Sequence, residues 1–300
     1  MRQSSYVGRF APSPTGRLHA GSLVAAVASY LDAKAHHGKW LLRIEDVDEG
    51  RTAAGAANAI VALLAQLGMH WDGDVAWQSR RKHLYQAAYE RLGDSTYPCG
   101  CNRREIADSR LGTGPDGAAI YPGTCRHGLP EGRTMRSLRL RVPDADAGAD
   151  EIAFDDRIAG RVVQHLAADS GDFVLKRADG FWAYQLAVVV DDAEQGVTDI
   201  VRGADLLDST PRQIYLQRLL GVPTPRYLHV PVLRTANGEK LSKQTGAVAV
   251  APSTEAEVLA VLLQAGASLA LDVPHAGSLP AFWQAATAAW ARRYGAADNA

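Results

Sequence analysis

Residues 8–22 read GRFAPSPTGRLHAGS and connect a short apolar strand to a long helix-like run. The connecting loop is rich in proline, glycine and serine, so its backbone N–H groups can approach a phosphate closely. His19 stands just before the small residues Ala20 and Gly21, where an imidazole can donate to phosphate oxygens and a flat base can approach the helix start. The stretch predicts a nucleotide site at the first strand–helix junction.

The segments on either side of this loop predict a strand–helix–strand unit. A first strand is expected over residues 6–10, a helix from Ser22 to about His36, and a buried second strand over residues 40–44. Two parallel strands joined by a helix imply a right-handed crossover. Ligands of such sheets bind beyond the carboxyl ends of the strands, so the first loop and Glu45 should face one pocket. We therefore predict an α/β fold with a Rossmann-like parallel sheet.

A second informative stretch lies far along the chain. Residues 238–244 read GEKLSKQ and place Lys240 and Lys243 around Ser242 on a predicted loop. Cations of this kind can meet the charge that develops on a leaving pyrophosphate. Either stretch alone is more often an ordinary surface feature. Together, and in this order, they indicate a site that binds ATP from two sides.

All three cysteines lie in one short part of the chain. Cys99 and Cys101 are separated by one residue, and Cys125 follows Tyr121 by four positions. Thiolates at such spacing suit tetrahedral zinc, with buried, unconnected cysteines as the alternative. Tyr121 and His127 are both candidates for a fourth ligand, and imidazole is the commoner one. A site closed by four protein ligands would be structural.

Composition narrows the classes of protein. The chain has 300 residues, 47% of them hydrophobic, which is enough for one large domain or two modest ones. Three cysteines do not suit a disulfide framework, and the N-terminus lacks the apolar core of a secretory signal. No apolar run reaches the roughly 18 residues that a membrane helix needs. We expect a cytoplasmic protein that has no membrane segment and is a monomer.

The charge of the chain bears on nucleic-acid binding. A formal net charge of −1 provides no overall basic field, so any contact with RNA would be local. Each basic cluster is also consistent with an ordinary solvated face. The candidate clusters are residues 80–82, Arg103 with Arg104, and Arg136 with Arg139 and Arg141.

The two signature stretches together resemble those of the class I aminoacyl-tRNA synthetases. The HIGH element of that family corresponds to HAGS at residues 19–22, and its KMSKS element to KLSKQ at residues 240–244. Ser22 replaces the second histidine and Gln244 the final serine, and a hydroxyl can replace one imidazole hydrogen bond. The resemblance implies that His19, Lys240 and Lys243 are catalytic. It also implies that ATP, with Mg²⁺, is bound by His19, Gly21, Ser22 and Lys243.

The run RFAPSPTGRLHAGS is closer still to the glutamyl-tRNA synthetase branch, and charge supports a glutamate site. Glutamate carries two carboxylates and one ammonium, so a selective pocket needs a fixed guanidinium and a carboxylate. The resemblance implies that Arg9 and Arg202 neutralise carboxylates and that Glu45 holds the α-ammonium. Tyr184 would hydrogen-bond the substrate. The full set implied for glutamate is Arg9, Phe10, Ala11, Pro12, Ser13, Glu45, Tyr184 and Arg202.

One short branch of these synthetases shares with this chain its length, the HAGS variant and the C-x-C, Y-x-x-x-C set. In that branch a tyrosine completes a structural zinc site, which implies one zinc ion per chain held by Cys99, Cys101, Tyr121 and Cys125. The chain ends 56 residues after Gln244, so we expect no helical anticodon-reading domain. The branch activates L-glutamate with ATP and attaches it to the queuosine base in the anticodon of tRNA(Asp).

We expect four regions along the chain. Patterns of secondary structure return after the cysteines. Strand-like runs lie at residues 173–175 and 197–202, and an apolar run lies at residues 184–190. A capping box at Thr254 and Glu257 predicts the start of a helix. The expected regions are residues 1–96 and 149–250 as halves of the catalytic domain, 97–148 as a zinc-binding insertion, and 251–300 as a short helical C-terminal region.

Three other functions are consistent with parts of the sequence. A minimal glutamyl-tRNA synthetase would charge the 3′ end of a tRNA instead of an anticodon base. A small nucleotidyltransferase would share the HIGH-like element, but it would not need Arg9, Glu45 and Arg202 together. A non-catalytic, zinc-containing RNA-binding paralogue is disfavoured by the intact Lys243.

Overall fold

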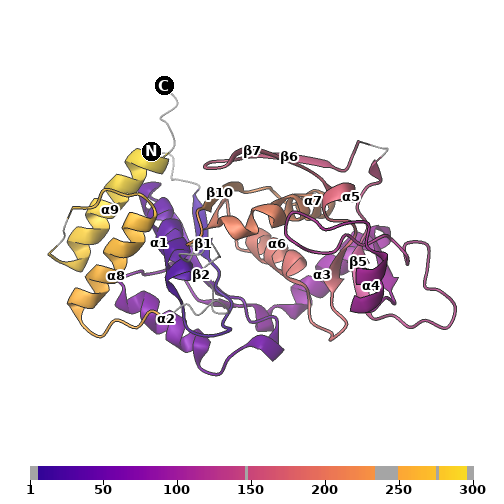
Figure 1. Ribbon diagram of the computed structural model, residues 1–300. Coiled ribbons are helices and arrows are strands. Elements are labelled where there is room, and N and C mark those ends of the chain that lie inside the picture. Colours follow the sequence, from indigo (N-terminus) through magenta and orange to yellow (C-terminus); the bar gives the residue numbers. More distant parts are fainter. Residues whose placement is uncertain (1–5, 146–147, 234–248, 275–276, 296–300) are drawn as a thin grey trace. The chain divides into compact units, whose positions relative to one another are not determined.

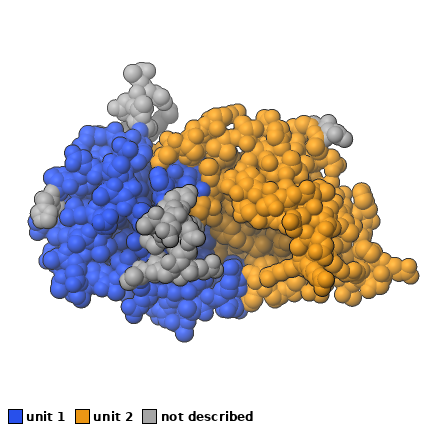
Figure 2. Space-filling model, viewed as in Figure 1, with its two compact units in different colours: residues 1–77, 197–204, 225–300 blue, residues 78–196, 205–224 orange. Residues whose placement is uncertain are grey.

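The computed structural model describes residues 6–145, 148–233, 249–274 and 277–295. The chain divides into two compact units (Figure 2). Unit 1 consists of Met1–Trp77, Val197–Ala204 and Pro225–Ala300, and unit 2 of Gln78–Gly196 and Asp205–Thr224. Unit 2 therefore extends beyond residues 97–148 on both sides.

Unit 1 is an α/β unit with a parallel sheet (Figure 1). Its strands pair in parallel as β1 with β2, β2 with β3, and β9 with β10. β9 lies beside β1, where the Thr198 N–H donates to the Val7 carbonyl at 2.9 Å. The elements are β1 (Val7–Phe10), α1 (Ala20–Ala35), β2 (Lys39–Ile44), α2 (Ala56–Gln66), β3 (Ala76–Trp77), β9 (Asp199–Gly203), β10 (Arg226–Val230), α8 (Glu255–Ser268) and α9 (Leu279–Tyr294).

The strand sets β1-β2-β3 and β9-β10 lie side by side at β1 and β9, which gives the order β3-β2-β1-β9-β10 of a doubly wound, Rossmann-like arrangement. The chain fills one side of β1 first and returns to the other side with β9, so the order of the strands reverses at β1. Ligands of such sheets bind at this reversal, beyond the carboxyl ends of the strands. The predicted fold class is confirmed. A ligand site is expected in the loops that follow Phe10 of β1 and Gly203 of β9.

Helix α1 lies at the centre of unit 1 and is buried along most of its length. It contacts β1, β2 and β9 as well as α8 and α9, and Figure 1 shows α8 and α9 beside it. Its fully buried Asp32 accepts hydrogen bonds from the Tyr6 hydroxyl at 2.7 Å and from the Trp290 indole N–H at 2.8 Å. Asp32 therefore joins the residue before the first strand, the central helix and the last helix.

The predicted helical C-terminal region is confirmed. The Thr254 hydroxyl accepts the Glu257 N–H, and the Glu257 carboxylate accepts the Thr254 N–H, so the predicted capping box opens α8. In α9, Phe282 and Trp290 are fully buried in the core of unit 1. The two helices thus complete the core around α1. Among the described residues, no helix is long and apolar enough to cross a membrane.

Unit 2 contains an antiparallel sheet of order β4-β5-β8 and a β6–β7 hairpin. The apolar run at residues 184–190 forms most of helix α6. The elements are α3 (Lys82–Leu92), β4 (Thr96–Cys99), α4 (Arg103–Ser109), β5 (Ser137–Leu140), β6 (Glu151–Asp156), β7 (Gly160–His165), α5 (Leu166–Asp169), β8 (Phe173–Lys176), α6 (Tyr184–Glu194) and α7 (Thr210–Leu220). Short 3₁₀ helices cover Glu49–Arg51 in unit 1 and Gln78–Arg80, Gly93–Ser95 and Ala204–Ser209 at or near unit 2.

Candidate active site and metal centre

His19 is the N-cap of α1. Its Nδ1 accepts the Ser22 N–H at 3.2 Å, and its Nε2 lies 3.0 Å from the Ser22 hydroxyl. The hydroxyl that replaces the second histidine of the HIGH element is therefore in contact with the first. Ala20, Gly21 and Ser22 are small and only half-buried, so a ligand can reach the positive end of the helix.

The chain returns to His19 after the lysine-containing stretch. Ala249 forms an antiparallel bridge with His19, and the Val250 N–H donates to the Leu18 carbonyl at 2.9 Å. The residues that follow KLSKQ are thus paired with those that open the HIGH-like element, although the two are far apart in sequence. Lys240 and Lys243 themselves lie outside the described residues.

Three of the residues expected to bind glutamate lie at the carboxyl edge of the unit 1 sheet. Arg9 is near the end of β1, Glu45 directly follows β2, and Arg202 is near the end of β9; both guanidinium-bearing side chains are buried. The Glu45 N–H donates to the Pro12 carbonyl at 3.0 Å, which ties the segment after β2 to the loop after β1. Two cationic groups and one carboxylate therefore share one sheet edge.

The other expected glutamate residues divide between the two units. Phe10 ends β1, and the loop continues with half-buried Ala11, buried Pro12 and exposed Ser13. Tyr184 is the first residue of α6 and belongs to unit 2. The structure thus places the unit 1 residues of the expected site at or just after the carboxyl ends of β1, β2 and β9.

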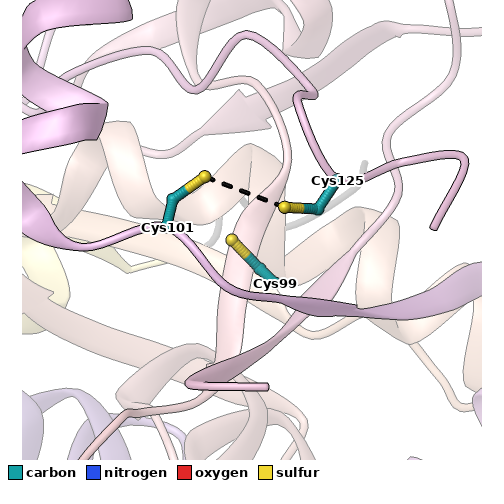
Figure 3. A group of neighbouring side chains, drawn as sticks. All are labelled: Cys99, Cys101 and Cys125. Atoms are coloured by element: carbon teal, nitrogen blue, oxygen red, sulfur yellow. Dashed lines mark hydrogen bonds between the residues drawn. The ribbon is translucent and has the colours of Figure 1, made fainter. Parts of the chain in front are cut away.

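The three cysteine sulfurs converge (Figure 3). They lie within 4.8 Å of one another, and the Cys101 and Cys125 sulfurs are 3.7 Å apart. The Tyr121 hydroxyl lies 3.3 Å from the Cys99 sulfur and 3.5 Å from that of Cys101. His127 is exposed and does not belong to this group. Of the two candidates for the fourth ligand, the phenol is the one beside the sulfurs.

Local structure explains this convergence. Cys99 ends β4, whose pairing with β5 fixes it opposite Ser137, and Cys101 stands just before α4. Tyr121 is bridged to Gly171, which has a φ of 61°. A Cβ atom at Gly171 would come within 2.9 Å of the Tyr121 carbonyl oxygen, so only glycine permits this approach.

The donor set fits a tetrahedral zinc ion. Zinc bonds of about 2.3 Å to sulfur and about 2.0 Å to oxygen imply S–S edges of roughly 3.8 Å and S–O edges of roughly 3.5 Å. The Cys101–Cys125 distance of 3.7 Å and the two S–O distances of 3.3 and 3.5 Å agree with these edges, and the Cys99 sulfur lies within 4.8 Å of the other two sulfurs. The Cys125 N–H also donates to the Tyr121 hydroxyl oxygen at 3.0 Å, which favours a phenolate, but burial and hydrogen bonds with the three cysteines together raise the pKa of Tyr121.

A buried arginine adds positive charge beside these ligands. The Arg139 guanidinium lies 3.8 Å from the centre of the Tyr121 ring and donates to the Asp172 carbonyl at 2.7 Å. Burial opposes ionisation of Cys99, but hydrogen bonds with Tyr121 and Arg139 outweigh it and lower the pKa of that thiol to about 7. Burial raises the pKa of the Cys101 thiol to about 11. The thiols of Cys99 and Cys101 therefore differ in acidity.

Buried Asp172 lies at the centre of a hydrogen-bond network next to the cysteine cluster. Its carboxylate accepts two hydrogen bonds from Arg126, at 2.6 and 2.7 Å, one from the Tyr97 hydroxyl at 2.5 Å and one from the Val142 N–H at 2.8 Å. Burial and the bond to Asp172 both raise the pKa of Tyr97. Arg126 follows Cys125 directly, so this network fixes the loop that carries the third sulfur.

The expected basic clusters are only partly exposed. Arg139 is buried against Tyr121, and Arg81 pairs with buried Asp191 at 2.6 Å, so neither is an open RNA contact. The residues that contact Arg139 and Arg81 are distant in the sequence, so sequence alone could not predict that these two arginines are engaged within the protein. Arg103, Arg104 and Arg136 are exposed.

The comparisons with known proteins agree with this geometry. Residues 6–259 match the model of the family "tRNA synthetases class I (E and Q), catalytic domain". The chain therefore belongs to the class I tRNA synthetases of the E and Q type. It is 65% identical over 291 residues to the glutamyl-Q tRNA(Asp) synthetase of Janthinobacterium sp. (strain Marseille), covering 97% of this chain and 98% of the relative. Within its class, the chain is a member of the glutamyl-Q tRNA(Asp) synthetase family.

Further relatives support the same assignment. The glutamyl-Q tRNA(Asp) synthetase of Verminephrobacter eiseniae (strain EF01-2) is 62% identical over 98% of this chain and 100% of its own length. Among solved structures, a glutamate tRNA ligase from Elizabethkingia meningosepticum in complex with its amino acid has a TM-score of 0.73 at 25% identity. The alignment covers 94% of this chain and spans 64% of that one. The resemblance inferred from the signature stretches is confirmed.

Proposed function

We propose that this protein activates L-glutamate with ATP and transfers the glutamyl group to the queuosine base in the anticodon of tRNA(Asp). The observation that carries the proposal is the identity of 62–65% over nearly the whole chain to relatives that bear this name. ATP enters with Mg²⁺, as expected for the class. We also propose that the protein acts in the cytoplasm as a monomer.

In the first step the glutamate α-carboxylate attacks the α-phosphorus of ATP, and pyrophosphate leaves. The N-terminal end of α1, with His19, Gly21 and Ser22, binds the nucleotide, because its small first turn admits phosphate and base. Lys240 and Lys243 neutralise the charge that grows on the pyrophosphate. The pairing of Ala249 with His19 supports this assignment, since it returns the lysine-containing stretch to the HIGH-like element.

The glutamate pocket is proposed at the carboxyl edge of the sheet. Arg9 and Arg202 neutralise the substrate carboxylates, and Glu45 holds the α-ammonium. Both arginines are buried, and charge-assisted hydrogen bonds are stronger away from water. Phe10, Ala11, Pro12 and Ser13 form the wall after β1, and Tyr184 donates a hydrogen bond to the substrate.

We propose that the cysteine cluster binds a structural zinc ion. The ligands are Cys99, Cys101, Tyr121 and Cys125. The donor set and the distances between its atoms support this assignment. When bound, the ion cross-links the end of β4, the start of α4 and the loop before β5. All four positions are taken by protein, so the ion has no place in the reaction.

A glutamate-dependent ATP–pyrophosphate exchange assay without tRNA tests the first half of the proposal. Exchange should occur with glutamate alone, because the proposed pocket contains no RNA group. A nucleotidyltransferase or a non-catalytic paralogue would show none. Transfer of labelled glutamate to queuosine-containing tRNA(Asp), with unmodified tRNA(Asp) as control, tests the second half. Labelling of both tRNAs would contradict the proposed acceptor.

A further inference from the structure

His229 is a buried histidine of β10 that contacts Arg202 of β9. The two residues face each other across the parallel pair, and the Arg202 Nε–H donates to His229 Nε2 at 3.0 Å. The side chain of His229 is 2% exposed, and the ring of Tyr227 stacks beside it with a centroid separation of 6.0 Å. The imidazole is therefore held in one place by its neighbours.

The chemistry of the contact fixes the protonation of the imidazole. A guanidinium has donors and no acceptor, so His229 Nε2 must accept and must carry no proton. A neutral imidazole then bears its proton on Nδ1. A protonated imidazole in this place would turn a donor toward Arg202 and repel it. The contact therefore requires a neutral acceptor at residue 229.

The contact also has a directional effect on Arg202. It uses the Nε–H, which lies on one edge of the planar guanidinium. The two terminal nitrogens carry the other donors, and a carboxylate is bound most selectively by two parallel N–H groups. A fixed Nε–H removes the rotation that would let the plane turn away from a substrate.

We infer that His229 is a positioning residue that orients the Arg202 guanidinium toward a carboxylate of the bound amino acid. The inference rests on the proposed role of Arg202 in glutamate binding. His229 does not touch the substrate, and its effect is on the affinity for glutamate rather than on the affinity for ATP.

Two substitutions separate the acceptor from the bulk of the side chain. His229→Gln keeps an acceptor on a side chain of similar length, whereas His229→Leu keeps the apolar bulk and removes the acceptor. His229→Leu should raise the KM for glutamate by about 10-fold or more, as expected for one lost hydrogen bond to a charged group. The KM for ATP should stay within about 2-fold, and His229→Gln should remain within about 3-fold of the wild type for both substrates.

Leu228→Ala is the matched control. Leu228 is buried on the same strand, and neighbouring residues of a strand point to opposite faces. It should lower thermal stability while leaving the KM for glutamate unchanged. If Leu228→Ala raises that KM as much as His229→Leu does, or if the Gln and Leu variants behave alike, the positioning role is wrong.

A measurement without substrate separates this inference from the proposed function. The ¹⁵N shifts of the His229 ring in the wild-type protein report which nitrogen carries the proton. The Nδ1–H form with bare Nε2 is expected, and a protonated Nε2 would overturn the inference even if glutamate is the substrate. Absence of glutamate-dependent exchange in the wild type, together with the expected ring form, would overturn the proposed function instead.

Discussion

The Tyr121 hydroxyl lies beside two cysteine sulfurs, whereas the His127 imidazole is exposed at the surface. Both residues are within a few positions of Cys125, and imidazole is the commoner zinc ligand, so sequence alone leaves the choice open. The structure brings the phenol to the sulfurs because the backbone at Tyr121 is bridged to Gly171. A contact with a residue 50 positions away thus selects between two neighbours.

Substitutions at the cluster test the metal assignment. Cys101→Ser should release zinc and loosen β4 and α4 without unfolding unit 1, and Tyr121→Phe should weaken zinc binding because it removes the phenol oxygen. Atomic emission after dialysis should find about one zinc ion per wild-type chain. His127→Ala is the control and should retain the ion. Loss of zinc from His127→Ala, with retention in Tyr121→Phe, would make the histidine the ligand.

Lys243 is expected to act on the transition state. Lys243→Ala should slow glutamyl-adenylate formation by about 100-fold or more, because one cation beside transferring phosphates is worth a few kcal/mol. The affinity for glutamate should change little. Single-turnover adenylate formation measures the rate, and Lys39→Ala, which removes one exposed lysine of β2, serves as the control. Unchanged adenylate formation in Lys243→Ala would contradict the assigned role.

Residues whose chemistry depends on near neighbours in the chain could be predicted from sequence. The contact of His19 with Ser22 spans three positions within one helix start, and the cysteines lie within one short segment. The roles of Arg139 and His229 could not be predicted. Arg139 alternates with leucines in β5 like any strand residue, and His229 meets Arg202 only through the pairing of β9 with β10.

At the scale of elements, the first strand–helix–strand unit follows directly from the sequence because its periodicity and loop residues agree with each other. The β6–β7 hairpin was not predicted. Its strands mix charged with apolar side chains, and its turn between Asp156 and Gly160 lacks a two-residue turn signature. The run at residues 184–190 is apolar at every position except Gln185, so periodicity could not show that it is helical.

The packing of α9 against α1 predicts how much stability is lost when the hydrogen bond between Trp290 and Asp32 is removed. Trp290→Phe removes the indole N–H that Asp32 accepts and leaves space in the core, so it should lower the free energy of unfolding by about 3 kcal/mol. Trp283→Phe is the matched control. Its indole donates only to the Leu67 carbonyl and it is partly exposed, so it should cost about 1 kcal/mol. Denaturant unfolding followed by circular dichroism measures both, and equal losses would show that Asp32 does not hold α9.

At the scale of the whole molecule, the proposed acceptor determines which part of the RNA must reach the adenylate. A base in an anticodon loop can be turned outward and read by stacking and by contacts to its edges. The proposed glutamate pocket contains no RNA group, so activation and transfer are expected to be separable steps. Transfer, unlike activation, should weaken steeply as salt is raised, because phosphate contacts dominate the affinity for RNA.

The most direct test of the account is transfer of labelled glutamate to queuosine-containing tRNA(Asp) from which the terminal CCA has been removed. Because the acceptor is the anticodon base, trimming should leave the rate and extent of labelling unchanged, and labelling should disappear when queuosine is absent. A trimmed substrate also avoids periodate, which would destroy the diol of queuosine together with that of the 3′ end. Charging of unmodified tRNA(Glu) at its 3′ end, with no labelling of trimmed queuosine tRNA(Asp), would contradict the account.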